Sequence, residues 1–254
     1  MRNWQISVLF FLLLLLGWEL LFRLGLWPPY VFPSPTSVAA ALVKGFASGQ
    51  YVLAVLTSLR RIAVGYGLSI LLGVPLGLAL GRSRLMQASL GSLVVGLQAL
   101  PSICWLPLAL IWFGLGETAI LFVVVMGALL AITISTADGV RNTPPLYQRA
   151  ARTMGARGLR LYARVILPAA YPGIVSGMKL GWSFAWRSLM AGELLFITLG
   201  LGQALAMGRE LNNMSAVIAV MLIIIAIGLG VDRLVFAPIE RSIRERWGLQ
   251  ASSR

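Results

Sequence analysis

The chain has 254 residues, of which 59% are hydrophobic and only 11% charged, with a formal net charge of +13. A soluble domain carries about 25% charged residues and could not hide this much apolar side chain, so the composition excludes a soluble fold and indicates a membrane protein. The single cysteine, Cys104, and the lack of histidine exclude an intrachain disulfide and most zinc or histidine-based chemistry.

Six apolar segments are long enough, or nearly long enough, to cross a bilayer as helices. They are residues 5–26, 58–81, 86–113, 118–138, 172–197 and 213–236. Lipid offers no partner for open strand edges, and the alternation of a barrel strand is absent. The sequence therefore predicts an all-α, polytopic membrane protein of about six transmembrane helices. We interpret residues 5–26 as a retained span, because no small-residue cleavage site follows.

The arginines set the expected orientation. With the N-terminus in the cytoplasm, residues 1–4, 82–85, 139–171 and 237–254 face inward and hold thirteen basic residues, whereas the external loops hold Lys44 and Arg209. This positive-inside bias places both termini in the cytoplasm. Membrane topology therefore explains the net positive charge of the chain, and we expect no nucleic-acid partner.

The external loop at 27–37 contains four prolines, which forbid a regular helix there. Thr36 or Ser37 is expected to cap a short amphipathic helix near residues 38–48. The chain thus divides into residues 1–57 with the first span and an external loop, a core at 58–236 that includes the long loop 139–171, and a cytoplasmic basic tail at 237–254.

The second and third spans carry packing and bending signals. Small residues recur at every fourth position of the second span and predict close packing of another helix: Gly65, Ser69, Gly73, Gly77 and Gly81. Pro75 predicts a kink in this helix. Pro101 and Pro107 break or bend the third span at membrane depth, which indicates either the border of a pathway or a structural bend.

Charged residues are unusual within the fifth span, where Lys179, Arg187 and Glu193 interrupt an apolar stretch. Each costs about 2.5–3.5 kcal/mol in lipid and should therefore face protein or water. Arg187 could bind an anionic substrate, because guanidinium forks suit oxyanions, or could form a structural pair with Glu193 or a neighbouring helix. The candidate translocation-pathway residues are Trp105, Trp182, Trp186, Arg187 and Glu193.

The loop at 139–171 is expected to hold two short helices. Pro144 and Pro145 can open a helix that runs over 146–154 and stops at Gly155, and a second helix over 159–167 should end before Pro168. Such a pair would present a compact knob to the cytosol, with small residues that permit docking into a groove of another protein. The alternative is an ordinary basic connector.

This loop carries a family resemblance. Its sequence reads Ala150-Ala151-Arg152-Thr153-Met154-Gly155-Ala156, followed after nine residues by Ile166-Leu167-Pro168. It resembles the EAA loop of binding-protein-dependent ABC importer permeases, in which E-A-A, three residues, G and nine residues precede I-x-L-P. Arg149 stands in the position of the family's glutamate.

The resemblance extends over roughly residues 58–247, to the nitrate/sulfonate/taurine branch. Its further motifs are Ser58-Leu59-Arg60-Arg61, Pro75-Leu76-Gly77-Leu78, Trp105-Leu106-Pro107-Leu108, Ile111-Trp112-Phe113-Gly114-Leu115-Gly116-Glu117, Gly192-Glu193-Leu194 and Gly200-Leu201-Gly202. It implies a MetI-like permease fold in the bacterial cytoplasmic (inner) membrane, and 145–157 as a coupling helix. The implied coupling residues are Arg149, Ala150, Ala151, Arg152, Thr153, Met154, Gly155 and Ala156.

The resemblance also implies partners and a mechanism. The partners are a second permease copy, two ATP-binding cassette ATPase subunits, and a periplasmic or lipid-anchored substrate-binding protein. Small anions such as nitrate, taurine or an aliphatic sulfonate would cross by alternating access. The sequence has no G-x-x-x-x-G-K-[ST], so ATP and Mg are expected on the ATPase, and no cofactor or metal on this chain.

Two other functions compete with this interpretation. A secondary transporter would work without ATP, but Glu193 is the one clear mid-span acid for ion coupling. A membrane-embedded enzyme would need paired acids, histidine or a metal set. The acids Glu19, Glu117, Asp138, Glu193 and Asp232 are instead scattered along the chain.

Overall fold

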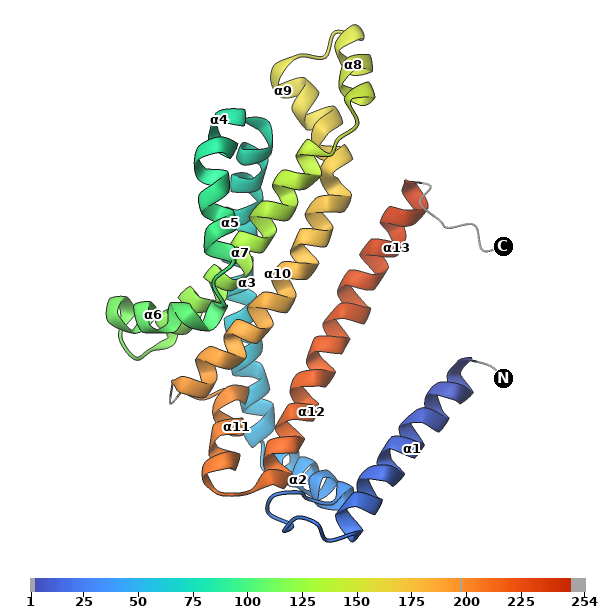
Figure 1. The fold of residues 1–254 in the computed structure, drawn as a ribbon, viewed down its shortest axis with the longest axis vertical. Coiled ribbons are helices and arrows are strands. Elements are labelled where there is room, and N and C mark those ends of the chain that lie inside the picture. Colours follow the sequence, from blue (N-terminus) through green and yellow to red (C-terminus); the bar gives the residue numbers. More distant parts are fainter. Residues whose placement is uncertain (1–2, 197, 248–254) are drawn as a thin grey trace. The chain divides into compact units, whose positions relative to one another are not determined.

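The computed structural model describes residues 3–196 and 198–247, and within them all regular structure is helical (Figure 1). The elements in chain order are α1 (Asn3–Arg23), α2 (Pro35–Ala47), α3 (Gln50–Arg82), α4 (Arg84–Met86), η1 (Gln87–Gly91), α5 (Ser92–Gln98), η2 (Ser102–Trp105), α6 (Leu106–Phe113), α7 (Glu117–Arg141), α8 (Pro145–Thr153), α9 (Gly158–Leu161), η3 (Tyr162–Ile166), α10 (Leu167–Leu195), α11 (Leu201–Glu210), α12 (Met214–Val231), η4 (Asp232–Phe236) and α13 (Ala237–Arg246).

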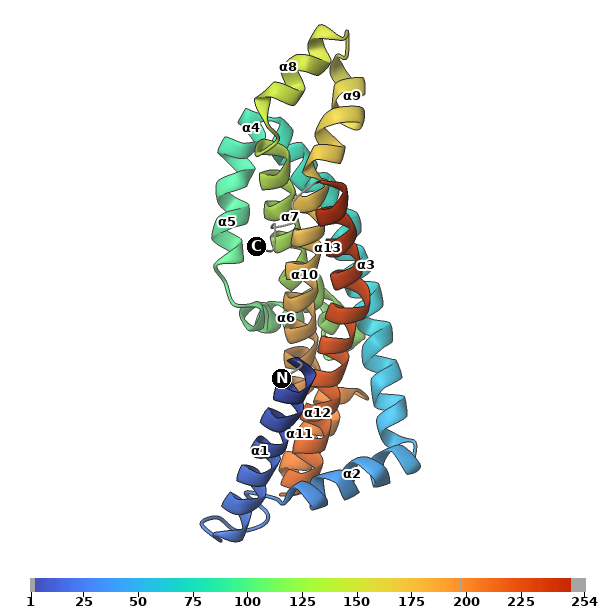
Figure 2. The same ribbon diagram turned by 90° about the vertical axis from the view of Figure 1, so that its right-hand side faces the viewer.

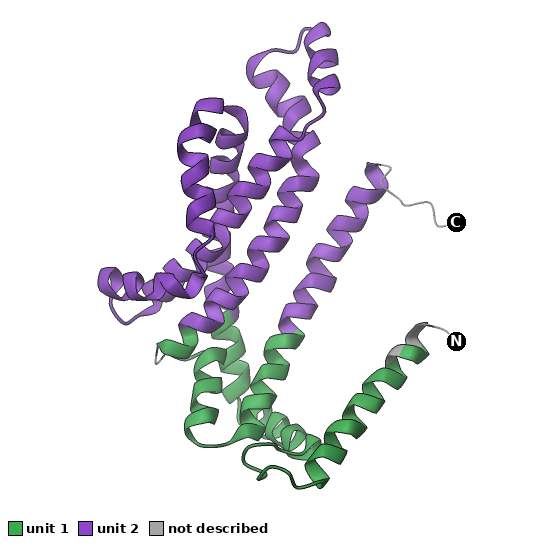
Figure 3. Ribbon diagram, viewed as in Figure 1, with its two compact units in different colours: residues 1–58, 193–226 green, residues 59–192, 227–254 purple. Residues whose placement is uncertain are grey.

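Two compact units are distinguished in Figure 3. The first comprises residues 1–58 and 193–226, and the second comprises 59–192 and 227–254. Both are discontinuous in sequence, and their boundaries fall inside α3, near the end of α10 and inside α12. The division at 1–57, 58–236 and 237–254 stays a prediction, although the residue stretch 214–246 is one continuous helix across the expected boundary at 236.

Three described helices are long and apolar enough to cross a membrane: Gln50–Arg82, Glu117–Arg141 and Met214–Arg246. The segments Arg84–Gln98 and Ser102–Phe113 meet at 102° and together have the length and composition of a fourth, broken span or of a re-entrant loop. The helices α1 (Asn3–Arg23) and α10 (Leu167–Leu195) overlap most of the predicted spans at 5–26 and 172–197, of which residue 197 lies outside the described residues. The multi-pass, all-helical fold is confirmed, whereas the count of six stays a prediction.

The break in the third span lies at the predicted place. Residues 99–101 separate α5 from η2, and α6 then turns across the direction of α5 and α7 (Figure 1). Pro101 cannot donate a backbone hydrogen bond and disfavours helical geometry in the residue before it, which explains why the helix stops here.

Three details of the predictions are wrong. Helix α3 begins at Gln50, eight residues before the predicted 58. Helix α2 is capped by Ser34, whose Oγ accepts a hydrogen bond from the backbone N–H of Ser37 at 3.2 Å, rather than by Thr36 or Ser37 itself. Pro35 then occupies the first helical turn, where its missing N–H costs nothing.

The third wrong detail concerns Pro168, which does not end a helix. Helix α9, the π-helical turn η3 and α10 follow one another without a gap. Another π-helical turn, η4, likewise ends two residues before Pro238 in α13. A proline ring clashes with the carbonyl four residues earlier in an α-helix, and the wider π turn gives it room.

The core of the second unit is built from α3, α5, α7 and α10, which run side by side in Figures 1 and 2. Buried Leu80, Val94, Leu130 and Ala137 join α3, α5 and α7. Val140 of α7 packs with Ala170 and Ile174 of α10. Helices α8 and α9 lie at one end of this unit, beyond the ends of α7 and α10 (Figure 2).

The predicted stripe of small residues on α3 is confirmed as a packing surface. A Cβ added at Gly73 would lie 3.0 Å from the carbonyl oxygen of Leu129, and one at Gly81 would lie 2.6 Å from Cβ of Val140, both on α7. Ser69 Oγ also lies 3.4 Å from the carbonyl oxygen of Val125. In lipid, such close backbone packing is a main source of helix association.

We expect Gly77→Leu to destabilise the folded chain and Gly67→Leu to leave it unchanged. A Cβ at Gly77 would lie 2.5 Å from the carbonyl oxygen of Thr133, whereas one at Gly67 has nothing within 4 Å. Overpacking of this kind costs about 1–3 kcal/mol. Thermal unfolding of the two variants in the same detergent measures the difference, and equal midpoints would contradict the packing role of the stripe.

Candidate functional site

Helix α8 forms the centre of the expected knob, and its bounds at Pro145–Thr153 confirm the predicted short helix. Pro145 occupies the first turn, and the buried Ala151 is the point where α8 rests on the rest of the unit. After α9, the O–H of Tyr162 donates a hydrogen bond at 2.8 Å to the carbonyl oxygen of Leu78 and ties η3 to α3. Burial raises the pKa of the Tyr162 phenol, and the nearby charge of Arg82 opposes this shift.

Gly155 ends α8 as predicted, and the geometry gives the reason. Its N–H donates to the carbonyl oxygen of Arg152 at 3.0 Å, and the N–H of Ala156 donates to that of Ala151 at 2.9 Å. This pair of hydrogen bonds is a Schellman motif, which requires a left-handed residue at the glycine position. Gly155 has a φ of +82°, and a Cβ there would meet nothing within 4 Å. The glycine is therefore needed for its conformation and not for close packing within the chain.

The knob exposes large apolar side chains on α8 and at its C-terminal cap, which we call the docking surface and define as Leu146, Tyr147 and Met154. Leu146 is 70% exposed and Met154 is 81% exposed. Among the predicted coupling residues, Arg149, Ala150, Arg152, Thr153, Met154 and Gly155 are also exposed, Ala151 is buried and Ala156 is half-buried. Exposed large apolar side chains on a helical projection are typical of a protein-binding surface.

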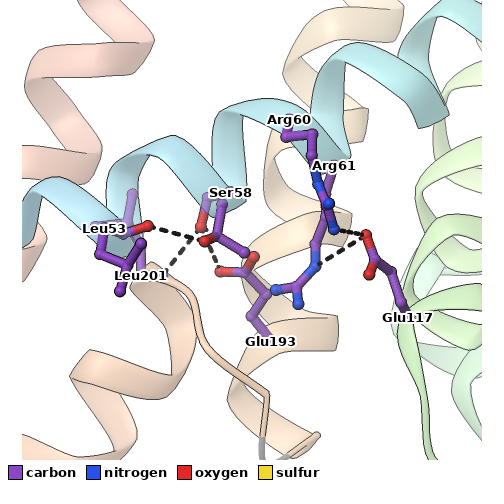
Figure 4. Close-up of polar contacts among 8 residues, drawn as sticks. Leu53, Ser58, Arg60, Arg61, Glu117, Glu193 and Leu201 are labelled. Atoms are coloured by element: carbon purple, nitrogen blue, oxygen red, sulfur yellow. Dashed lines mark hydrogen bonds and ion pairs between the residues drawn. The ribbon is translucent and has the colours of Figure 1, made fainter.

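Glu193 has a different setting, inside the first unit (Figure 4). Its side chain is fully buried near the C-terminal end of α10. Its carboxylate accepts hydrogen bonds from the Ser58 hydroxyl, at 2.7 Å and 2.9 Å, and from the backbone N–H of Gly202 at 3.0 Å. Ser58 Oγ in turn accepts a hydrogen bond at 2.9 Å from the N–H of Leu201.

These contacts make Ser58 and Glu193 the N-terminal cap of α11. Leu201 and Gly202 are the first two residues of that helix, and Gly200, at the N-cap position, has no side chain to satisfy their N–H groups. A carboxylate at a helix N-terminus is also favoured by the helix dipole. A Cβ at Gly202 would lie 2.5 Å from Cβ of Glu193, so glycine is required for this close approach.

The aromatic pathway candidates are partly brought together. Trp182 and Trp186 stack with ring centroids 5.9 Å apart, and Tyr66 meets Trp182 edge-to-face at 5.5 Å. Trp105 packs against Phe122 and lines a cavity of about 150 Å³ beside the break of the third span. Phe184 lines the same cavity.

Arg187 is exposed on α10, with its Cζ 5.7 Å from the ring centroid of Phe184. Its neighbour in sequence, Trp186, is buried instead. An exposed guanidinium within an apolar helix is costly in lipid, so this face of α10 is expected to contact water or another protein chain.

Sequence reasoning missed three polar contacts. Lys179 Nζ lies 3.0 Å from Asp232 and 3.2 Å from Glu240, which ties α10 to η4 and α13. Arg60 of α3 pairs with Glu117 at the start of α7, as Figure 4 shows. Asp232 and Glu240 lie eight residues apart in sequence, a spacing that places both acids on one helix face. This spacing is the sequence signal from which their contact with Lys179 could have been predicted.

Among the described residues, no three acidic or cysteine side chains are grouped to hold a metal ion.

The family described as binding-protein-dependent transport system inner membrane component matches residues 69–244. A chain from Methanocaldococcus jannaschii, named as an ABC transporter permease protein, is 34% identical over 85% of this chain and 82% of its own length. The taurine transport system permease protein TauC of Escherichia coli is 31% identical over 79% of this chain and 75% of its own. The nitrate import permease protein NrtB of Leptolyngbya laminosa is 33% identical over 70% and 64%.

Among solved structures, the MetNI methionine ABC transporter in an inward-facing conformation aligns with a TM-score of 0.64, covering 78% of this chain and 97% of that one at 21% identity. This likeness confirms the MetI-like fold. The family match covers more than half of the chain and agrees with the relatives in sequence. The chain therefore belongs to the binding-protein-dependent inner membrane transport components and is a permease subunit of an ABC importer, a transport component rather than an enzyme.

Proposed function

We propose that this subunit carries a small anion across the cytoplasmic membrane of a bacterium, as one of two copies driven by two separate ATPase subunits. A periplasmic or lipid-anchored binding protein delivers the substrate to the outer face. The observation that carries the proposal is the docking surface on α8, held by the Schellman motif at the positions of the EAA-like sequence. The positive-inside bias supports a cytoplasmic location for this knob and for both termini.

The connections of the knob suit it for transmitting motion. Helix α7 ends at Arg141, four residues before α8 begins, and α9 and η3 continue directly into α10. A push on α8 by an ATPase subunit therefore reaches two spans through short or continuous helical connections. Lys179, with Asp232 and Glu240, extends this connection to the C-terminal helix. ATP and Mg bind to the partner, and closure of the two ATPase subunits rocks the spans between outward-facing and inward-facing states.

Two observations support an anionic substrate and a second copy. One relative is named for the transport of taurine, which carries a sulfonate group, and another for the import of nitrate, so both named substrates present an oxyanion. Arg187 is exposed on an apolar span, where it would cost about 2.5–3.5 kcal/mol against lipid. A water-filled pathway between two copies of the chain removes this cost and places a guanidinium where an oxyanion passes.

We expect Arg187→Gln to lower uptake of the anion by at least tenfold in the assembled importer, and Arg187→Lys to retain part of it. The ligand is first identified by mass spectrometry of the cognate binding protein, and uptake is then measured in proteoliposomes with ATP. The ATPase content of each preparation serves as the control for assembly. Normal uptake by assembled Arg187→Gln importer would show that Arg187 does not line the anion route.

A further inference from the structure

A cavity rich in arginine lies between the knob and the ends of α3 and α7, entirely within the second unit. Its volume is about 600 Å³. Its basic lining residues are Arg82, Arg84, Arg141 and Arg152. Of these, Arg141 pairs with Asp138 at 2.5 Å, and no acidic residue lines the cavity itself. Four arginines therefore line the cavity, and Asp138 neutralises the charge of only one of them. This net positive charge favours the binding of a phosphate or another oxyanion.

The cavity has a mostly apolar neighbour. A second hollow of about 570 Å³ shares Arg82, Ser83 and Tyr162 with the first and is otherwise lined by apolar residues. Those residues are Leu78, Ala79, Met86 and Leu159. A basic cavity beside an apolar groove matches a ligand with an anionic head and a hydrocarbon tail, and a free inorganic ion would leave the groove empty.

The location agrees with such a ligand. Arg82 is the last residue of the span α3, and Arg141 is the last residue of the span α7. Span ends are the depth at which lipid headgroups lie, and basic pockets between spans on the cytoplasmic side bind anionic headgroups. The cytoplasmic location of the cavity rests on the membrane orientation given under the proposed function.

We propose that this cavity binds the phosphate headgroup of an anionic phospholipid of the inner leaflet, with its acyl chain along the adjoining groove. Gln148 and Arg152 of α8 line the same cavity, so the bound lipid also braces the knob against the spans. The knob is then held by a membrane component as well as by Ala151 and Tyr162.

Native mass spectrometry of the purified full chain tests the proposal, with phosphatidylglycerol and phosphatidylcholine as probes. We expect retention of phosphatidylglycerol but not of phosphatidylcholine, and a loss on the order of tenfold in the Arg82→Gln/Arg84→Gln double variant. The matched control is Arg241→Gln/Arg244→Gln, which removes two exposed charges of α13 outside the cavity. Equal losses in both double variants, or no loss in the first, would overturn the proposal.

A second measurement uses the unsubstituted chain and so does not depend on the folding of a variant. A phosphatidylglycerol with a photoreactive headgroup should label residues 82–84 and 158–162, and unlabelled phosphatidylglycerol should suppress this labelling. Suppression by millimolar inorganic phosphate would identify a free-anion site and contradict the lipid. Labelling elsewhere would also contradict the lipid site.

If the Arg82→Gln/Arg84→Gln variant loses the ATPase but keeps the lipid, the cavity binds an acidic segment of the ATPase instead. None of these measurements requires transport, so they are independent of the proposed substrate.

Discussion

Glu193→Ala is expected to destabilise the folded chain by about 3 kcal/mol, because it leaves the Ser58 hydroxyl and the Gly202 N–H without their buried acceptor. Removal of the side chain also opens a cavity at a site that is fully buried. The start of α11 then has an unsatisfied first turn in an apolar environment, which is where such groups cost most.

Thermal unfolding in detergent, followed by size-exclusion chromatography, measures this loss. Glu193→Gln keeps one acceptor oxygen and is expected to fall between wild type and Glu193→Ala. Glu210→Ala is the matched control, since it removes an exposed carboxylate at the other end of α11. An unchanged midpoint for Glu193→Ala would show that Glu193 does not cap this helix.

Gly155→Val is expected to release the ATPase from the purified importer, whereas Gly155→Asn should retain most of it. The φ of +82° costs an ordinary residue about 1–2 kcal/mol, a β-branched residue pays more, and asparagine tolerates the left-handed region best after glycine. Loss of the Schellman motif would change the direction in which the chain leaves α8 and so displace Met154 and Leu159.

The readout is the amount of ATPase that co-purifies with equal amounts of each variant. A Cβ at position 155 meets nothing within 4 Å, so both variants place their Cβ in open space and differ chiefly in how well they tolerate the positive φ. Equal retention of the ATPase by the two variants would exclude the conformational explanation.

Local sequence signals predicted much of the fold. Apolar stretches marked the spans, the four-residue spacing of Gly73, Gly77 and Gly81 marked a packing surface, and Gly155 marked the end of α8. Each of these features depends on neighbours within a few residues or on the solvent that the segment meets. The family match then set aside the secondary transporter and the membrane enzyme as alternatives.

The remaining features depend on contacts between distant parts of the chain. Ser58 and Glu193 are 135 residues apart, so nothing local indicates that together they cap α11. The 102° bend at Pro101 has a local cause, but its angle is set by packing. The helix continues past Pro168 because a π turn precedes it, and the composition of that stretch does not indicate such a turn.

The central claim is that α8 is a cytoplasmic knob that contacts the ATPase, and site-specific crosslinking tests it most directly. In a Cys104→Ser background, Leu146→Cys should react with a thiol reagent from the cytoplasmic side and crosslink to the co-expressed ATPase. Leu115→Cys, which is also highly exposed, at 82%, but lies in a predicted external loop, should react from outside and give no such crosslink. Labelling of Leu146→Cys from outside, or its full protection in membranes without the ATPase, would contradict the account.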